Sequence, residues 1–267
     1  MYTLATLCND ICLPEEVTAL VLELEKTIQV PTEKLYHKET WEEGLTELRT
    51  ALDPDPDGFK ILACMLRCAA ERREEYLAQG FSHEIYVETM KAFSRFVGEH
   101  MESFGRYGFD RWFWTVRQLS LVLFRIGELE YEFKEKNGQD VISLHIPSDA
   151  KLEMPLLRKS YEEAKALLVP FFPGAENSVW CCGSWLLGPA LQELLPADSR
   201  ILGFQRNFQV TRTYPDPQFK QWVYKRIDIP NEDLPENTSL QRKMKAWLLA
   251  GNEYLSGEGP LVEDPFL

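Results

Sequence analysis

The chain lacks the features by which several classes of protein are usually identified. No apolar run approaches the roughly 20 residues that a membrane-spanning helix needs, and the start at Met1 has no basic region of a signal peptide. Basic residues are also scarce, because 29 Lys and Arg face 42 Asp and Glu, for a net charge of −13. Such a charge repels a phosphate backbone. We therefore expect a cytoplasmic protein with no membrane or nucleic-acid partner.

Short motifs for nucleotide hydrolysis, dinucleotide binding, zinc proteolysis and α/β-hydrolase chemistry are all missing. No two of the six cysteines have C-x-x-C spacing, and Cys64 and Cys68 fall in an apolar helical stretch where burial is expected. The segment from Asp53 to Gly58 begins like a calcium loop, but its twelfth position is Cys64 instead of a bidentate Glu. We expect no metal and interpret this segment as a polar turn that caps the next helix.

The first hundred residues have apolar side chains at the helical period, most clearly in the segments 41–52 and 86–104. The segment 59–70 is apolar on most sides, which is typical of the central helix of a bundle. Asp110 is a good N-cap for a short helix through Trp112. From Leu119 the period changes to two, which predicts a hairpin with an apolar face and a solvated glutamate face. The predicted boundary separates residues 1–108 from residues 109–267.

The remaining elements alternate between strand and helix, so the predicted fold class is α/β, or more loosely α+β. We expect strands at 141–146 and 178–187, a helix at 161–169 between them, and a short helix at 189–195. The segments 201–212 and 218–229 are predicted to form a closing antiparallel pair, and 240–249 a last helix that ends at Gly251. The strands 141–146 and 178–185 are expected to be parallel neighbours.

Several segments together resemble a bacterial family of acyltransferases that pairs a helical N-terminal domain with a GNAT-like C-terminal domain. These segments are RWFW at 111–114, FRIGELEY at 124–131, HIPSD at 145–149, SWLL at 184–187 and ILGFQ at 201–205. The resemblance covers nearly the whole chain. It implies a mixed sheet in which two neighbouring parallel strands splay apart, with the thioester of acetyl-CoA or another acyl-CoA lying in the gap.

One segment departs from the GNAT pattern. The family holds the CoA pyrophosphate with a glycine-rich loop before a helix, whereas the segment 147–156 contains no glycine and carries Asp149 and Glu153. Arg158 and Lys159 follow this segment and are the candidates for contacting the phosphates, and Ser143 is a further cofactor-binding candidate.

The polar residues expected to face the gap are the candidate catalytic residues, namely His145, Ser148, Cys182, Ser184 and Gln205, with Asn207 beside them. His145 is either a general base for an amine or hydroxyl acceptor or a core histidine bonded to a backbone carbonyl. Cys182 is either a nucleophile or an inert buried thiol. Trp112 or Trp114 is expected to close one side of the cleft.

Three functions remain open at this point. The first is an acyl-CoA-dependent N- or O-acyltransferase that acts on a small-molecule acceptor by direct transfer. The second is a catalytically silent GNAT-like binding module that has lost the pyrophosphate loop. The third is a carbohydrate-directed protein, suggested by the seven tryptophans and the alternation of Glu128, Glu130 and Glu132, although such glutamates are more often the wet face of a strand.

Overall fold

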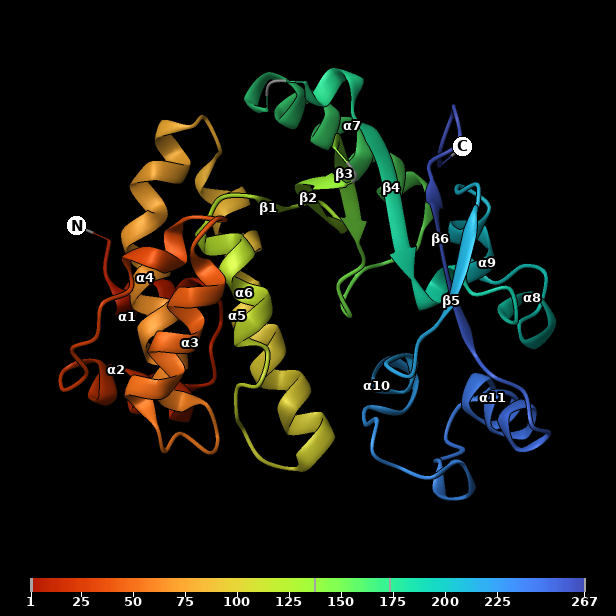
Figure 1. Ribbon diagram of the computed structural model, residues 1–267, viewed down its shortest axis with the longest axis horizontal. Helices are drawn as coiled ribbons and strands as arrows, with labels where there is room; N and C mark the ends of the chain where they lie inside the picture. The colour runs from red at the N-terminus through yellow and green to blue at the C-terminus, as the bar shows by residue number, and fades with distance from the viewer. Residues whose placement is uncertain (1, 137, 173, 267) are drawn as a thin grey trace. The chain divides into compact units, whose positions relative to one another are not determined.

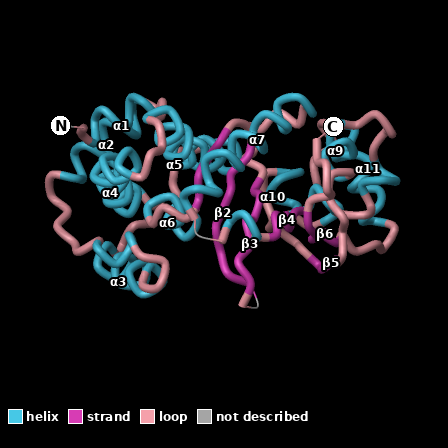
Figure 2. The backbone as a smooth tube through the Cα atoms, turned by 90° about the horizontal axis from the view of Figure 1, so that it is seen from above, coloured by secondary structure: helices cyan, strands magenta, loops and turns pink. Residues whose placement is uncertain are grey.

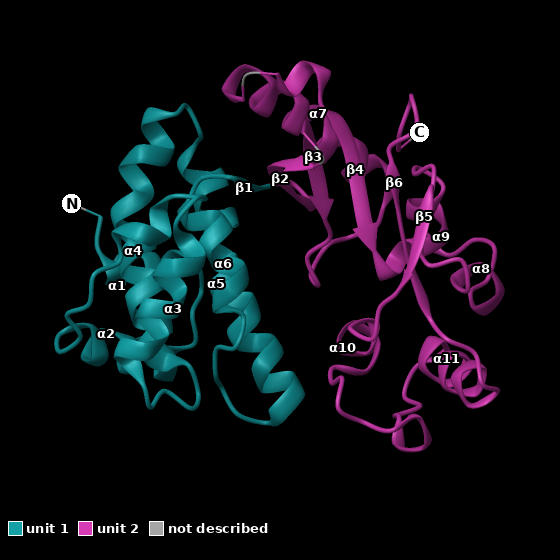
Figure 3. Cartoon of the chain, viewed as in Figure 1, with its two compact units in different colours: residues 1–125 teal, residues 126–267 magenta. Residues whose placement is uncertain are grey.

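The computed structural model describes residues 2–136, 138–172 and 174–266, and Figures 1 and 2 trace them as a ribbon and a tube. The chain forms two compact units, Met1–Arg125 and Ile126–Leu267 (Figure 3). In the described ranges, no helix is both long and apolar enough to cross a membrane. Each unit has its own core and is described by itself.

The first unit is helical. Its helices are α1 (Leu4–Asp10), α2 (Glu15–Glu25), α3 (Trp41–Leu52), α4 (Phe59–Ala78), α5 (His83–Phe104) and α6 (Trp112–Leu119), with a short 3₁₀ turn at Glu33–Tyr36. Helix α4 contacts all five of the others, and Cys64 and Cys68 are buried within it. The prediction of a central helix with two buried cysteines is therefore confirmed.

The polar turn before α4 acts as a cap, as predicted. The carboxylate of Asp55 accepts hydrogen bonds from the backbone N–H of Lys60 at 3.0 Å and of Ile61 at 2.9 Å. These donors belong to the first turn of α4, which has no partner for them within the helix. The carboxylate at the third position of the calcium-like loop is thus engaged by backbone N–H groups.

Helix α6 belongs to the helical unit, because it contacts α4 and α5. The division of the structure falls after Arg125, whereas the change of hydrophobic period had placed a boundary after Gly108. Arg111, not Asp110, is the N-cap residue of α6, so the predicted cap was wrong by one residue. Helix α5 ends at Gly105, whose φ of +69° favours glycine.

The second unit is built on a mixed sheet. Within the described residues the sheet has six strands in the order β1-β2-β3-β4-β6-β5, of which β1 crosses the division after Arg125 and the other five belong to the second unit. The strands are β1 (Leu123–Ile126), β2 (Leu129–Lys136), β3 (Gln139–His145), β4 (Val179–Ser184), β5 (Arg212–Pro215) and β6 (Leu255–Pro260). The helices are α7 (Met154–Phe171), α8 (Leu191–Leu194), α9 (Arg200–Gln205), α10 (Phe219–Tyr224) and α11 (Ser239–Leu249), with 3₁₀ turns at Ala175–Asn177, Trp185–Leu187 and Asn231–Asp233.

Strands β3 and β4 are parallel neighbours, and α7 lies between them in sequence (Figure 1). The predicted parallel pair is thus confirmed. Helix α7 begins at Met154, several residues earlier than expected, with Pro155 in its first turn. All other pairings are antiparallel where the register is defined, namely β2 with β3, β4 with β6 and β5 with β6.

One face of the sheet is covered by α7. Tyr131 of β2 hydrogen-bonds Ser160 of α7 at 2.9 Å, and Trp180 of β4 packs edge-on against Tyr161 of α7. Helix α9 lies on the same side as α7 in Figure 2, and both helices contact Phe266. We call this side the α7 face. The other side is called the open face because α7 does not cover it, although Glu130, Glu132 and Ser143 on it are buried. Side chains alternate between the two faces along each strand.

The predicted closing pair of strands at 201–212 and 218–229 was wrong. These segments contain the short helices α9 and α10, and the closing strands are β5 and β6 instead. Short apolar segments do not distinguish a helical period from an alternating one. Strand β6 was missed because its sequence, LSGEGP, has little β-propensity.

The glycines of β6 allow two chain segments to pass close to the sheet. A Cβ at Gly257 would clash with the carbonyl of Leu187, and a Cβ at Gly259 would clash with the carbonyl of Gln209. Both glycines lie on the α7 face, because they pair with Ser184 and Cys182. Glycine is therefore required in β6 by the close approach of neighbouring backbone.

Gly259→Ala should lower the free energy of unfolding by about 1 to 3 kcal/mol, because the backbone near Gln209 has to move away. Gly203→Ala is the matched control in the same unit, since its nearest neighbour would lie at an ordinary 3.6 Å. The control should change stability by no more than about 0.5 kcal/mol. Urea unfolding of the two variants compares them, and equal midpoints would contradict this explanation of the glycine.

Candidate functional site

The sheet opens where β3 and β4 stop pairing. Their register runs from Val141 opposite Val179 to Leu144 opposite Cys182. Beyond this point β4 continues through Gly183 and Ser184, but these residues pair with β6. Pairing between the two parallel strands therefore ends after Leu144, near their carboxyl ends, and such ends are a common place for ligands in α/β sheets.

A histidine and a buried glutamate lie beside this opening, on the open face. His145 is the last residue of β3, and its Nε2 lies 2.8 Å from Oε2 of Glu132 on β2. The side chains are 19% and 8% exposed, and Nζ of Lys134 lies 3.6 Å from the same carboxylate oxygen. Because a carboxylate only accepts, Nε2 of the imidazole donates its proton in this hydrogen bond.

The glutamates of β2 do not form the solvated face that their alternation predicted. Glu130 is 2% exposed and Glu132 is 6% exposed as whole residues. Glu130 is directly opposite His145 in the register, and Glu132 is opposite Ser143. The error has a physical cause, because a carboxylate can be buried where a histidine and a lysine accompany it. Glu132 is the main functional candidate that sequence reasoning missed.

Gly183 leaves room on the open face at the point where β4 departs from β3. The nearest atom to a Cβ at this position would be the hydroxyl oxygen of Tyr214 at 3.4 Å, followed by the side chain of Glu258. Burial raises the pKa of Tyr214, and the charges of Asp216 and Glu258 raise it further. Tyr214 therefore keeps its proton at neutral pH and presents a hydroxyl group beside the opening.

Because side chains alternate along a strand, the predicted catalytic and cofactor-binding residues of β3 and β4 lie on both faces of the sheet. Ser143 and His145 lie on the open face, whereas Cys182 and Ser184 lie on the α7 face, because Cys182 is opposite Leu144. Cys182 is fully buried, and this burial raises the pKa of its thiol. The hydroxyl of Ser184 accepts a hydrogen bond from the N–H of Leu186 and so caps the 3₁₀ turn after β4. The structure thus does not bring these four residues together.

Gln205 and Asn207 do not come from a strand. Gln205 is the last residue of α9, and its Nε2 donates to the carbonyls of Gly188 at 3.0 Å and Leu186 at 3.4 Å. Asn207 donates to the carbonyl of Gly203 at 2.8 Å. Ser148 is exposed in the turn after β3. These hydrogen bonds of Gln205 and Asn207 hold the loops around α9.

Arg158 and Lys159 are exposed in the second turn of α7. Nε of Arg158 donates to Glu162 at 2.9 Å, and Nζ of Lys159 lies 3.7 Å from Glu163. Both are helical i,i+4 pairs at the surface, where such pairs are weak. The two cations can therefore exchange these partners for a ligand anion at little cost.

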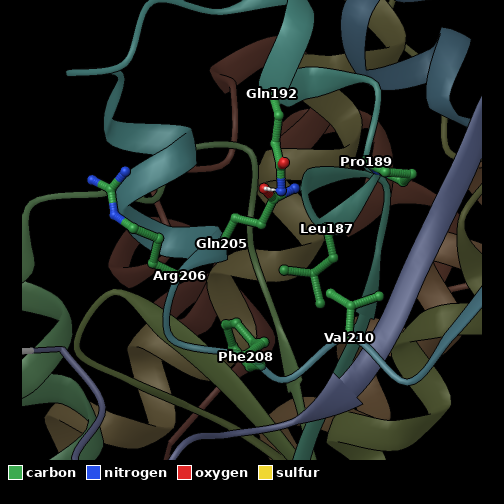
Figure 4. Close-up of a pocket in the computed structure, with 7 residues that line it drawn as sticks. All are labelled: Leu187, Pro189, Gln192, Gln205, Arg206, Phe208 and Val210. Carbon is green, nitrogen blue, oxygen red and sulfur yellow. Dashed lines mark hydrogen bonds between the residues drawn. The ribbon is translucent and has the colours of Figure 1, made fainter.

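A pocket of about 280 Å³ lies in the second unit and is shown in Figure 4. It is lined by Leu187, Pro189, Gln192, Gln205, Arg206, Phe208 and Val210. Most of its wall is apolar, with one hydrogen-bonded pair of glutamines, in which Nε2 of Gln192 donates to Oε1 of Gln205 at 3.0 Å. In the described residues no cluster of three or more metal-ligating side chains was found.

Comparison with known proteins defines the class. Residues 123–261 match the family described as GNAT-like C-terminal domain, and residues 2–121 match the N-acyltransferase N-terminal domain. The chain therefore belongs to the family in which an N-acyltransferase N-terminal domain precedes a GNAT-like C-terminal domain. Among curated proteins no sequence matches.

The fold is also found in solved structures. An acyltransferase in complex with decanoyl-CoA has a TM-score of 0.71 at 21% identity, covering 97% of this chain and 99% of the other. An acyltransferase in complex with CoA and 10C-teicoplanin has a TM-score of 0.70 at 22% identity, covering 97% and 100%. At this identity the likeness establishes the fold shared along the chain.

The burial of Cys182 gives a direct test of its reactivity. In the folded protein, iodoacetamide at pH 8 should modify the exposed Cys12 and leave Cys182 unmodified, because the thiolate is the reacting form and burial disfavours it. Mass spectrometry of peptides before and after unfolding measures both sites. Rapid labelling of Cys182 in the folded state would restore it as a candidate nucleophile.

Proposed function

We propose that this protein is an acyl-CoA-dependent N- or O-acyltransferase that acts on a small-molecule acceptor. The observation that carries the proposal is the end of β3–β4 pairing after Leu144, with the pair of His145 and Glu132 beside it. An extended thioester fits between separated strand ends, where backbone groups can pair with its amides. The family assignment and the related acyltransferases crystallised with CoA and decanoyl-CoA support the same donor.

His145 is the proposed general base. Glu132 orients the imidazole through Nε2–H, and we assign to Nδ1 the role of accepting a proton from the acceptor amine or hydroxyl group as that group attacks the thioester carbon. A C–N or C–O bond forms, the C–S bond breaks, and the CoA thiolate leaves and takes up a proton. Glu132 stabilises the positive charge that develops on the imidazole. Ser143 and Ser148, before and after His145, are proposed to help position the donor.

The loop between β3 and α7 differs from the glycine-rich loop that holds the CoA pyrophosphate in GNAT enzymes. It contains no glycine, and the N–H of Lys151 donates to Glu128 at 2.7 Å. Glu153 lies before α7 and is paired with Arg200 at 3.3 Å. The loop therefore does not form the close cradle of backbone N–H groups that a glycine loop provides. Arg158 and Lys159 are the proposed contacts for the pyrophosphate instead.

The same loop favours the second candidate function, a silent GNAT-like binding module. In that case the loop has lost the groups that hold the donor, and no acyl-CoA binds. Thermal unfolding separates the two candidates, because a ligand at 100 times its dissociation constant stabilises the folded state by about 2.7 kcal/mol.

Acetyl-CoA or decanoyl-CoA should raise the melting temperature, and the dissociation constant should increase between low and high salt. The reason is that exposed cations provide most of the phosphate recognition and are screened by salt. Calorimetry at two salt concentrations measures the effect. Absence of stabilisation by either ligand at low salt would favour the silent module.

His145→Ala should lower kcat about 100-fold or more, and Glu132→Gln about tenfold, with little change in KM for the donor. The assay measures release of free CoA from acetyl-CoA with a panel of amines, amino sugars and alcohols. His37→Ala is the matched control, because His37 is exposed in the helical unit, and it should keep full activity. Unchanged kcat in His145→Ala would contradict the assignment of the base.

A further inference from the structure

The pocket lined by Leu187, Phe208 and Val210 presents one defined hydrogen-bond acceptor. Nε2 of Gln205 donates to two backbone carbonyls, which fixes its Oε1 as the acceptor for Nε2 of Gln192. The orientation of the Gln192 amide follows, with its own Oε1 left as an acceptor at the pocket (Figure 4). A ligand in this pocket therefore meets apolar walls and a carbonyl oxygen that selects an N–H donor.

The positively charged side chain of Arg206 lies at the edge of the same pocket. Arg206 is exposed, lines the pocket, and extends outward from the glutamine pair in Figure 4. Arg206 forms no ion pair with any residue in the described ranges, unlike the nearby Arg200, which pairs with Glu153. Its five N–H donors suit a phosphate group.

The pocket lies at the same end of the sheet as the opening between β3 and β4. Leu187 ends the 3₁₀ turn that directly follows β4, and its carbonyl passes over Gly257. Met154, the first residue of α7, lies near the pocket loop, because its Sδ is 3.7 Å from Nδ2 of Asn207. The pocket therefore adjoins both the end of β4 and the start of α7.

We propose that this pocket binds the adenosine 3′-phosphate portion of CoA. This inference rests on the proposed function and assigns a subsite to it. The adenine ring lies against the apolar walls, its exocyclic amine donates to Oε1 of Gln192, and the 3′-phosphate contacts Arg206. Arg158 and Lys159 contact the pyrophosphate, so the pyrophosphate and the 3′-phosphate of the donor are bound by different cationic side chains.

The chemistry of the lining disfavours the acyl chain as the occupant. A hydrocarbon chain offers nothing to the acceptor on Gln192 or to the guanidinium of Arg206, and burying them against it would cost their hydration. A purine nucleotide uses both groups and the apolar walls. The pocket, of about 280 Å³, is slightly smaller than the roughly 300 to 1,000 Å³ typical of small-molecule sites, so it would take only one portion of a large ligand.

The first test separates the two phosphate sites by calorimetry with CoA and 3′-dephospho-CoA. Arg206→Gln should weaken CoA about fivefold and leave dephospho-CoA unchanged, because only CoA carries the contacted phosphate. The double variant Arg158→Gln with Lys159→Gln is the comparison, and it should weaken both ligands equally. Equal losses for both ligands in Arg206→Gln, or no loss for either, would overturn the inference.

The second test separates the nucleotide from the acyl chain. Val210→Trp fills the pocket from an exposed loop position, so it should weaken CoA and decanoyl-CoA by the same factor. If only decanoyl-CoA is weakened, the pocket holds the acyl chain and the inference fails while the proposed function stands. If the unmodified protein binds neither ligand, both the inference and the proposed function fail.

Discussion

The second unit depends on how β4 pairs with its two neighbours, β3 at its start and β6 at its end. The first four residues of β4 pair with β3, and the last four pair with β6. Strand β6 holds the end of β4 because Gly257 and Gly259 let the carbonyls of Leu187 and Gln209 lie directly against it. A side chain at either glycine would push away the segments that follow β4 and α9. The end of β4 beside the opening is thus held by its pairing with β6, on the edge of β4 away from β3.

This arrangement gives the opening two chemically different sides. On the open face, the His145 and Glu132 pair lies beside the room left by Gly183, and the Tyr214 hydroxyl is near. On the α7 face lie the start of α7 and the pocket with Arg206. The proposed group transfer would use both sides, because the donor has to be held by its large polar part while its thioester meets the acceptor.

The sequence predicted the parts of the fold that rest on long or strongly patterned segments. The central helix α4, the parallel pair of β3 and β4, and the family itself were all correct. Strand β6 was not predictable from its own residues, because its glycines are explained by segments far away in the chain. The helix α9 was mistaken for a strand because six residues are too few to define a period.

The sequence could not assign the candidate site residues to one face of the sheet, and the reason is the alternation of side chains along a strand. His145 was named correctly as a residue at the end of β3, but Cys182 and Ser184 point to the opposite face. A shift of one residue decides the face, and only the register with neighbouring strands fixes it. Glu132 was dismissed as solvated because burial depends on what lies over the strand, which its own sequence does not encode.

The central claim is that the separated ends of β3 and β4 hold the donor. Backbone amide hydrogen exchange with and without CoA tests it most directly, since a ligand between the strands protects the amides it contacts. The account predicts slower exchange in the segments 144–146 and 183–185 when CoA is bound. Protection that appears elsewhere in the chain, with these two segments unchanged, would contradict it.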